Sequence, residues 1–130
     1  MKLKKWIFVL CSFLASFFLV ACQSSSSSSQ SAVEAIKQKG KLVVATSPDY
    51  APFEFKVLVD GKNQVVGADI DMAQAIADEL GVKLEVSSMS IDNVLTSLQT
   101  GKADLAIAGF SATEERKEVF DFSFPYLMLI

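Results

Sequence analysis

The residues best suited to chemistry lie in 107–117, IAGFSATEERK, where an apolar run ends at Gly109 and hydroxyl residues, two acids and Arg116 follow. An arginine guanidinium is a planar fork of donors that suits a carboxylate or a phosphate. Ser111 or Thr113 can cap the next turn, whose free N–H groups attract an anion. The pattern predicts a carboxylate-binding corner. The competing interpretation is a surface ion pair between Arg116 and a nearby acid, worth under about 1 kcal/mol.

Aromatic side chains in SPDYAPFEF (47–55) form a second candidate group. Two prolines make this segment a loop or turn that leads into extended chain. The rings of Tyr50 and Phe53 suit an apolar wall or a surface for a ligand ammonium group. Ordinary packing beneath the loop is the alternative, above all for Phe53. Asp69 and Asp71 could be a pair of acid–base carboxylates. Both stand at the start of a predicted helix, however, where acidic residues are favoured without any catalytic role.

Histidine is absent, and only two cysteines occur, Cys11 and Cys22. Because Cys11 lies inside an N-terminal apolar run that we expect to be removed, no disulfide framework or thiol–metal site remains. The lack of histidine removes the usual general base and the commonest metal ligand. We therefore expect no catalytic residues, no metal and no cofactor.

The N-terminus is typical of a secretory signal. Three lysines precede an apolar run over 6–20, and small residues follow it. A transmembrane anchor is the alternative, but the run is short for the roughly 20 residues that a bilayer requires. LVAC (19–22) is similar to the lipobox of bacterial lipoproteins, in which the cysteine receives a diacylglyceryl group and becomes the first residue. We expect a signal peptide over 1–21 and lipidation of Cys22, with an unmodified thiol as the alternative.

Residues 22–32 contain that cysteine and a serine-rich tract, which predicts a flexible tether. Past Cys22 the three N-terminal lysines are gone, which leaves nine basic and 15 acidic residues and a net charge of −6. This balance, without a basic cluster, argues against nucleic acid as a partner. The acids are spread along the chain and indicate a solvated face.

The elements that must position these residues alternate between helix and strand. Periodicity and turn residues predict helices over 31–40, 68–81, 90–101 and 113–120, strands over 41–46, 82–88, 103–109 and 126–130, and a hairpin over 55–67. Three polar residues after Asp60-Gly61 favour a hairpin loop longer than two residues. The run 103–109 is typical of a strand buried on both faces. In 90–101, Ser90 is the expected cap, and Ile91 is expected to face inward with Val94, Leu95 and Leu98.

This order predicts an α/β fold in which helices flank a mainly parallel sheet with right-handed crossovers. Such sheets bind ligands outside the carboxyl ends of their strands. The loops 47–53 and 109–116 both follow predicted strand ends, so we expect them to form the site together. The chain stops within an apolar run, and we expect it to be cut off there.

Three segments also carry a family resemblance: KLVVATSPDYAPFEF (41–55), GADIDMAQAIADELG (67–81) and LTSLQTGKADLAIAGFSATEERKEVFDFSFPY (95–126). Together they resemble the polar amino-acid substrate-binding proteins of ABC importers, the family-3 solute-binding proteins. The resemblance implies two periplasmic-binding-protein-like α/β lobes that close on a free amino acid. Residues 33–130 would be the N-terminal part of the first lobe, with the second missing. It also implies a monomer, lipid-anchored on the extracytoplasmic face of the cell membrane, that delivers the amino acid to ABC permease subunits.

The resemblance implies a role for several residues. Arg116 falls on the arginine that grips the ligand α-carboxylate, and Ser111 on the hydroxyl residue that assists it. Gly109 falls on the backbone carbonyl that accepts the ligand ammonium, and Tyr50 on the aromatic residue that packs over the ligand.

Phe110, Ser47 and Ile91 complete the expected ligand-binding set, and two of these depart from the family pattern. Ser47 stands where many members have an aspartate for a distal amino or amide group, and Ile91 where a second aromatic residue is usual. Ala68 replaces a large apolar residue, which affects packing more than binding. An extracytoplasmic enzyme (a lyase or dehydratase) or a sensor domain on the same fold is the alternative function.

Overall fold

The computed structural model of the chain describes residues 31–126. The expected signal peptide, Cys22 and most of the tether lie outside the described residues, as does 127–130 of the last expected strand. No helix within 31–126 combines the length and the apolar character needed to cross a membrane.

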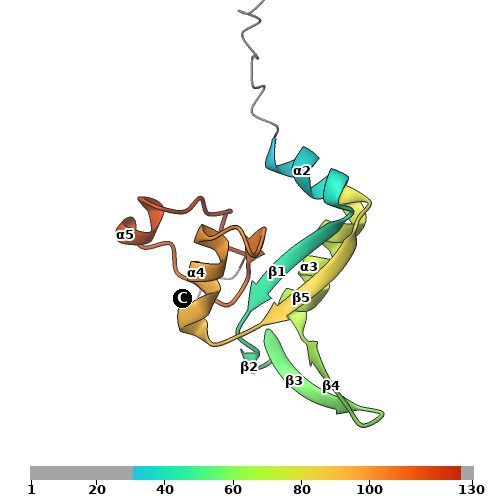
Figure 1. Cartoon of the computed structure of the whole chain (residues 1–130). Coiled ribbons are helices and arrows are strands. Elements are labelled where there is room, and N and C mark those ends of the chain that lie inside the picture. Colours follow the sequence, from blue (N-terminus) through green and yellow to red (C-terminus); the bar gives the residue numbers. More distant parts are fainter. Residues whose placement is uncertain (1–30, 127–130) are drawn as a thin grey trace, which may run out of the picture. The chain divides into compact units, whose positions relative to one another are not determined.

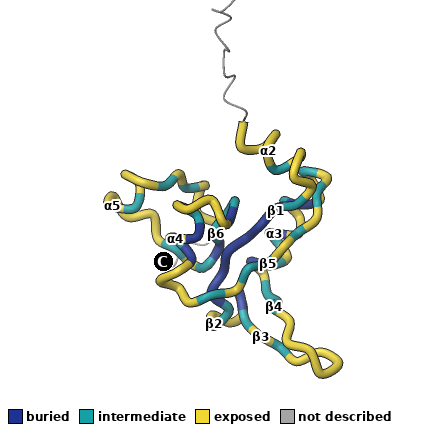
Figure 2. The backbone as a smooth tube through the Cα atoms, in the orientation of Figure 1, coloured by how far each residue is buried: buried dark blue, intermediate teal, exposed yellow. Residues whose placement is uncertain are grey.

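A three-stranded parallel sheet in the order β5-β1-β6 forms the centre (Figure 1). Strand β1 (Lys41–Thr46) pairs along its whole length with β5 (Lys83–Ser88) and, through two residues, with β6 (Leu105–Ala106). The burial colouring of Figure 2 marks β1 as the most enclosed strand. Five of its six residues are buried because the strand is central and covered on both faces.

Helices cover the two faces of this sheet, and alternate residues of β1 point to each face. Leu42 and Val44 pack with residues of α3 (Ala68–Leu80). Ile36 of α2 (Ala32–Lys39) packs against the same cluster. Val43 and Ala45 pack on the other side with α4 (Ile91–Gln99). The predicted α/β fold, with helices flanking a parallel sheet, is therefore confirmed.

The predicted hairpin lies in a separate antiparallel sheet, β2-β3-β4, made of β2 (Asp49–Tyr50), β3 (Glu54–Val59) and β4 (Lys62–Val66). The expectation of a longer hairpin loop is wrong. Asp60 and Gly61 alone make the turn, with φ of 49° and 74°, as a tight primed turn requires. The polar residues that suggested a longer loop belong to β4, an edge strand whose first three side chains are exposed.

Two further expectations need correction. The strand predicted over 103–109 is reduced to Leu105–Ala106, which is only half-buried, because β6 is the edge of the described parallel sheet. Ile91 does not face inward: it is 44% exposed, and the buried residues of α4 are Val94 and Ser97. Ser90 is the N-cap residue of α4 as expected, but its hydroxyl makes no capping bond and accepts from the Asn93 amide.

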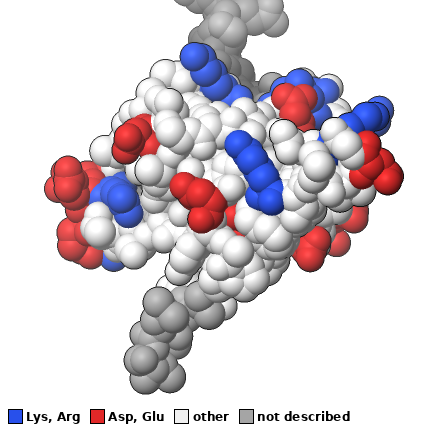
Figure 3. Space-filling view, turned by 90° about the horizontal axis from the view of Figure 1, so that it is seen from below, with Lys and Arg blue, Asp and Glu red and all other residues white. Residues whose placement is uncertain are grey.

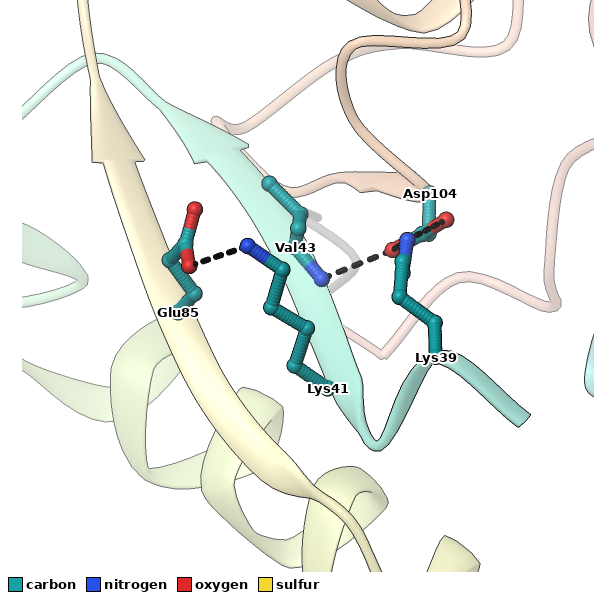
Figure 4. A network of polar contacts seen from close by, with 5 residues as sticks. All are labelled: Lys39, Lys41, Val43, Glu85 and Asp104. Carbon is teal, nitrogen blue, oxygen red and sulfur yellow. Dashed lines mark hydrogen bonds and ion pairs between the residues drawn. The ribbon is translucent and has the colours of Figure 1, made fainter. Parts of the chain in front are cut away.

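A network of ion pairs ties the sheet to α2 on the side away from the strand ends that carry the loops (Figure 4). Lys39 Nζ lies 2.6 Å from Asp104 Oδ2, and the same oxygen accepts from the Val43 N–H at 2.8 Å. A second pair joins Lys41 and Glu85 across β1 and β5 at 2.8 Å. These contacts join α2, β1, β5 and the residue before β6, and they lie apart from the predicted site.

Candidate functional site

Three loops leave the carboxyl ends of the parallel strands, which is where open sheets of this kind bind ligands. The loops after β5 and β6 are both attached to β1, because Met89 donates to the Thr46 carbonyl and Ile107 to the Ala45 carbonyl, each at 3.0 Å. Figure 3 views the molecule from the side toward which β1 and β5 point, and shows acidic and basic side chains interspersed among uncharged ones.

The loop after β1 and the loop after β6 meet at Tyr50 and Gly109. A Cβ atom added to Gly109, whose φ is +60°, would lie 3.4 Å from Cε1 of Tyr50. The tyrosine ring therefore packs directly on the glycine backbone, and its outer half stays exposed, at 48% for the residue. Phe53 lies behind it with ring centroids 5.3 Å apart. The structure thus brings together two of the residues that the sequence predicted for the site.

Arg116 lies in the short helix α5 (Glu114–Lys117), which begins after Thr113. Of the two expected caps, Thr113 is the one that forms, because its hydroxyl accepts from the Arg116 N–H at 3.3 Å. The guanidinium folds back over the preceding loop. Its Nη1 donates to the Ser111 carbonyl at 3.0 Å, and its Cζ lies 5.2 Å from the centroid of the Phe110 ring. Phe110, Ser111 and Arg116 are therefore one contiguous corner.

The structure does not support the competing interpretation, in which Arg116 forms a surface ion pair. Among residues 31–126, Arg116 takes part in no salt bridge. The neighbouring Lys117 instead pairs with Glu114 at 2.7 Å, and this ammonium group lowers the pKa of Glu114. One bond to a neutral carbonyl leaves most of the five guanidinium donors available to an anion.

Ser47 lies apart from this corner. It is 4% exposed and borders a small polar hollow of about 350 Å³ between the ends of β1 and β5. The remaining lining residues are Pro48, Asp49, Lys56, Ser88, Met89 and Ser90. Ile91 follows the last of these in the chain. The sequence did not single out Asp49 and Lys56. Asp49 is close to Ser47 in the chain, whereas Lys56 comes to this hollow only because β3 pairs back on β2.

A larger, mainly apolar groove of about 730 Å³ runs along the free edge of β6. Phe110 lies at the junction of this groove and the Arg116 corner, because it contributes to both. The other walls come from Met72 and Ile76 of α3, Leu95, Leu98 and Gln99 of α4, Asp104–Ile107, 119–124 and Tyr126.

The expectation that the acids form a solvated face is wrong for two of them. Glu54 and Asp69 are each 1% exposed, and their carboxyl groups are in hydrogen-bonding contact. The Tyr126 hydroxyl donates to Asp69 at 3.0 Å. Burial, and then the hydrogen bond with Asp69 and the charge of that residue, raise the pKa of Glu54 to about 8. Burial and Asp69 also raise the pKa of Tyr126 to about 12.

Sequence reasoning missed this cluster because helix position alone explained Asp69. The signal that was available is Glu54 itself, an acid enclosed between Phe53 and Phe55 in a β-rich run. No group of three or more acidic, histidine or cysteine side chains within 31–126 is arranged to hold a metal ion.

The chain matches the family model for bacterial extracellular solute-binding proteins, family 3, over residues 42–129. The arginine-binding extracellular protein ArtP of Bacillus subtilis is 40% identical over 124 residues, which are 95% of this chain and 45% of that protein. A cyclohexadienyl dehydratase of Pseudomonas aeruginosa is 37% identical over 114 residues, 88% of this chain and 41% of the enzyme. The chain therefore spans less than half the length of these relatives.

Solved structures of amino-acid-binding proteins are also similar to this chain. An amino acid ABC transporter substrate-binding protein of Streptococcus pneumoniae, bound to L-arginine, has 91% identity and a TM-score of 0.72 over 75% of this chain and 40% of its own. The arginine-bound form of domain 1 of the Thermotoga maritima arginine-binding protein (T. maritima ArgBP) has 44% identity and a TM-score of 0.65, over 71% of each chain. The fold is thus a periplasmic-binding-protein-like lobe, and the chain belongs to the bacterial extracellular solute-binding proteins of family 3.

Proposed function

We propose that this protein binds a free amino acid outside the cytoplasm, with L-arginine as the first candidate, and delivers it to the permease subunits of an ABC importer. The observation that carries the proposal is the Arg116 corner, where a guanidinium makes no ion pair with a carboxylate among residues 31–126 and lies over the loop that follows β6. The arginine-binding relative and the two arginine-bound structures support the choice of ligand.

In this proposal Arg116 binds the α-carboxylate of the ligand through its remaining donors. Its bond to the Ser111 carbonyl and its contact with the Phe110 ring hold the guanidinium in place before the ligand arrives. Such preorganisation reduces the entropy lost on binding. The Ser111 hydroxyl assists at the carboxylate.

In the same proposal the α-ammonium group of the ligand lies where Tyr50 packs on Gly109. The Gly109 carbonyl accepts from the ligand ammonium, and the exposed Tyr50 ring covers the ligand. We assign Ser47, which borders the hollow between β1 and β5, and Ile91, which is exposed, to the side chain of the ligand. The hollow at Ser47 is polar, and Asp49 supplies a carboxylate that attracts a guanidinium, while Lys56 supplies an ammonium group that repels it.

The domain assignment is part of the proposal. Residues 1–21 are a signal peptide, 22–32 a lipidated cysteine and tether, and 33–130 the N-terminal part of lobe 1. The protein is then a monomer anchored through Cys22 on the extracytoplasmic face of the membrane. The arginine-bound isolated domain 1 of a relative supports binding by a first lobe without its partner lobe.

The test is isothermal titration of L-arginine into the full-length protein and into Arg116→Ala. Loss of a charge-assisted contact of about 1.5–3 kcal/mol weakens binding by roughly 10- to 150-fold. Lys117→Ala is the matched control, because it removes the adjacent cation, which already pairs with Glu114. If Arg116→Ala binds as tightly as Lys117→Ala does, the carboxylate assignment is wrong. If no free amino acid binds the parent protein, the proposed function fails.

An enzyme is the second candidate, because one relative is a dehydratase. Release of water from a cyclohexadienyl compound by the full-length protein would favour this candidate. A parent protein that binds arginine and shows no turnover would exclude it.

A further inference from the structure

The buried cluster of Glu54, Asp69 and Tyr126 is not part of the Arg116 corner and has no role in the binding chemistry described above. We infer that Glu54 and Asp69 share one proton and, with Tyr126, form a positioning clamp that holds both lips of the ligand site in place. The inference rests on the proposed function where the test measures arginine binding. The expected effect of the clamp on protein stability does not depend on the proposed function.

The first step concerns the number of protons. Two carboxyl groups in contact, each 1% exposed, cannot both be ionised without a large cost, because the repulsion is not screened by water. The charged and titratable groups that act on Glu54 are Asp69, Asp49 and Tyr126, and none of them is a cation. The pair therefore keeps one proton in the folded protein at neutral pH.

The second step places that proton. Asp69 lies in the first turn of α3, where the helix dipole favours a negative charge. The Tyr126 hydroxyl donates to both of its oxygens, at 3.0 and 3.1 Å. Glu54 has no such donor, and its Oε2 has no hydrogen-bond partner among the described residues. Asp69 is thus the ionised acceptor, and Glu54 carries the proton and donates it to Asp69.

The third step connects the clamp to the Tyr50 loop. Glu54 directly follows the turn 50–53, in which the Phe53 N–H donates to the Tyr50 carbonyl at 2.9 Å. The start of α3 holds this turn through the backbone: Asp69 donates to the Phe53 carbonyl at 2.9 Å, and Ala68 to the Pro52 carbonyl at 3.2 Å. The contact between the two carboxyl groups is the side-chain part of the same attachment. Tyr50 keeps its place on Gly109 because the turn is attached in this way.

The fourth step connects the clamp to the other lip. The chain runs from Arg116 through 117–125 to Tyr126, whose hydroxyl is anchored on Asp69. Ionisation of Glu54 would set two carboxylates against each other and would shift the start of α3. Both attachments, to the Tyr50 turn and to Tyr126, depend on that helix start. The folded protein therefore holds both lips best while Glu54 is protonated.

The pH dependence has a definite sign. The pKa of Glu54 is raised from 4.5 to about 8 in the folded protein. The folded state then binds one proton more than the unfolded state between these two values. Stability from this group is full below about pH 4.5, declines as pH rises toward about 8, and stays lost above that.

The experiment compares the full-length protein with Glu54→Gln, which keeps a neutral side chain of the same shape, and with Glu85→Gln as an exposed control whose partner is Lys41. Three measurements are made from about pH 3 to about pH 9, a range that includes both 4.5 and 8: the thermal midpoint without ligand, the side-chain carboxyl carbon signal of Glu54 by NMR, and arginine affinity. We expect the parent and Glu85→Gln to lose thermal stability and affinity toward high pH. Glu54→Gln should show a flat stability profile above about pH 6. Its arginine affinity should fall less than that of the parent protein, because only loss of the proton from the ligand ammonium remains at high pH.

The outcomes are separable. A Glu54 signal that titrates near 4.5, or a Glu54→Gln protein with the parental pH profile of stability, overturns the clamp. The stability of the parent protein could fall with pH as expected while its arginine affinity does not change with pH. The two acids would then be a structural pair without a positioning role, and this result also overturns the clamp. If arginine does not bind at any pH while the thermal midpoint follows the expected profile, the proposed function has failed and the proton-sharing pair stands. Tyr126→Phe, which removes only the donor to Asp69, should weaken arginine binding at neutral pH.

Discussion

Gly67 offers the sharpest test of how the ligand loop is held. Its φ of 131° and ψ of 176° lie in a region that only glycine occupies readily, and an added Cβ would fall on the Phe53 carbonyl oxygen, 2.6 Å from the Phe53 carbonyl carbon and 2.8 Å from the Pro52 oxygen. Backbone atoms cannot move aside as a side chain can. Gly67→Ala must therefore push the turn 50–53 away from the start of α3.

The magnitude follows from what is lost. The backbone conformation costs an alanine about 1–3 kcal/mol. The two bonds from Ala68 and Asp69 to that turn contribute about 1 kcal/mol each. We expect Gly67→Ala to lower the free energy of unfolding by about 3–5 kcal/mol in total. Because the same turn carries Tyr50, arginine affinity should fall as well.

Urea denaturation measures this loss, and Gly40→Ala is the matched control. Gly40 also has a positive φ, 73°, at the end of α2, but nothing lies within 4 Å of an added Cβ. That substitution should cost only about 1–2 kcal/mol of backbone strain. If the two variants unfold with free energies within about 1 kcal/mol of each other, the close approach of Gly67 to Phe53 does not hold the loop, and the reasoning is refuted.

Two further predictions concern regions away from the site. Asp104→Ala should lower the free energy of unfolding by about 1–3 kcal/mol, because it leaves the N–H of the buried Val43 without its acceptor. Glu85→Ala, which breaks only an exposed pair, should cost under about 1 kcal/mol, and equal thermal shifts would contradict this ranking. Cys22→Ala should release the protein from the membrane into the medium, as measured by fractionation and immunoblotting. Continued tight anchoring of that variant would rule out lipidation at Cys22.

Much of the element order could be predicted from local pattern. Helices α2, α3 and α4 begin and end within about two residues of the expected positions, because glycines and hydroxyl residues mark their ends. The strands β1 and β5 were clear for the same reason, since each is a short apolar or alternating run between such signals. A rule about parallel sheets was then enough to expect the loops after β1 and β6 to meet, and Tyr50 does lie on Gly109.

Pairing and burial required the folded chain. Only the three-dimensional structure shows that β4 uses its polar residues as an edge strand, that Thr113 rather than Ser111 caps α5, and that Ile91 is exposed. Each of these outcomes depends on which neighbours surround a residue, and local sequence does not contain that information. The roles assigned to Ser47, Phe110 and the other ligand residues stay predictions, of which the titration of Arg116→Ala tests the carboxylate contact.

The two acids make the distinction clearest. By itself the sequence determined that Arg116 stands at a turn after a strand, and so it could indicate a carboxylate site from residue type and position. It also determined that Asp69 begins a helix, which was a sufficient local explanation. Only the tertiary structure decided that Glu54 and Asp69 meet with almost no exposure to water. Whether a carboxyl group keeps its proton depends on the groups around it in space, and residues 54, 69 and 126 become neighbours only when the chain folds.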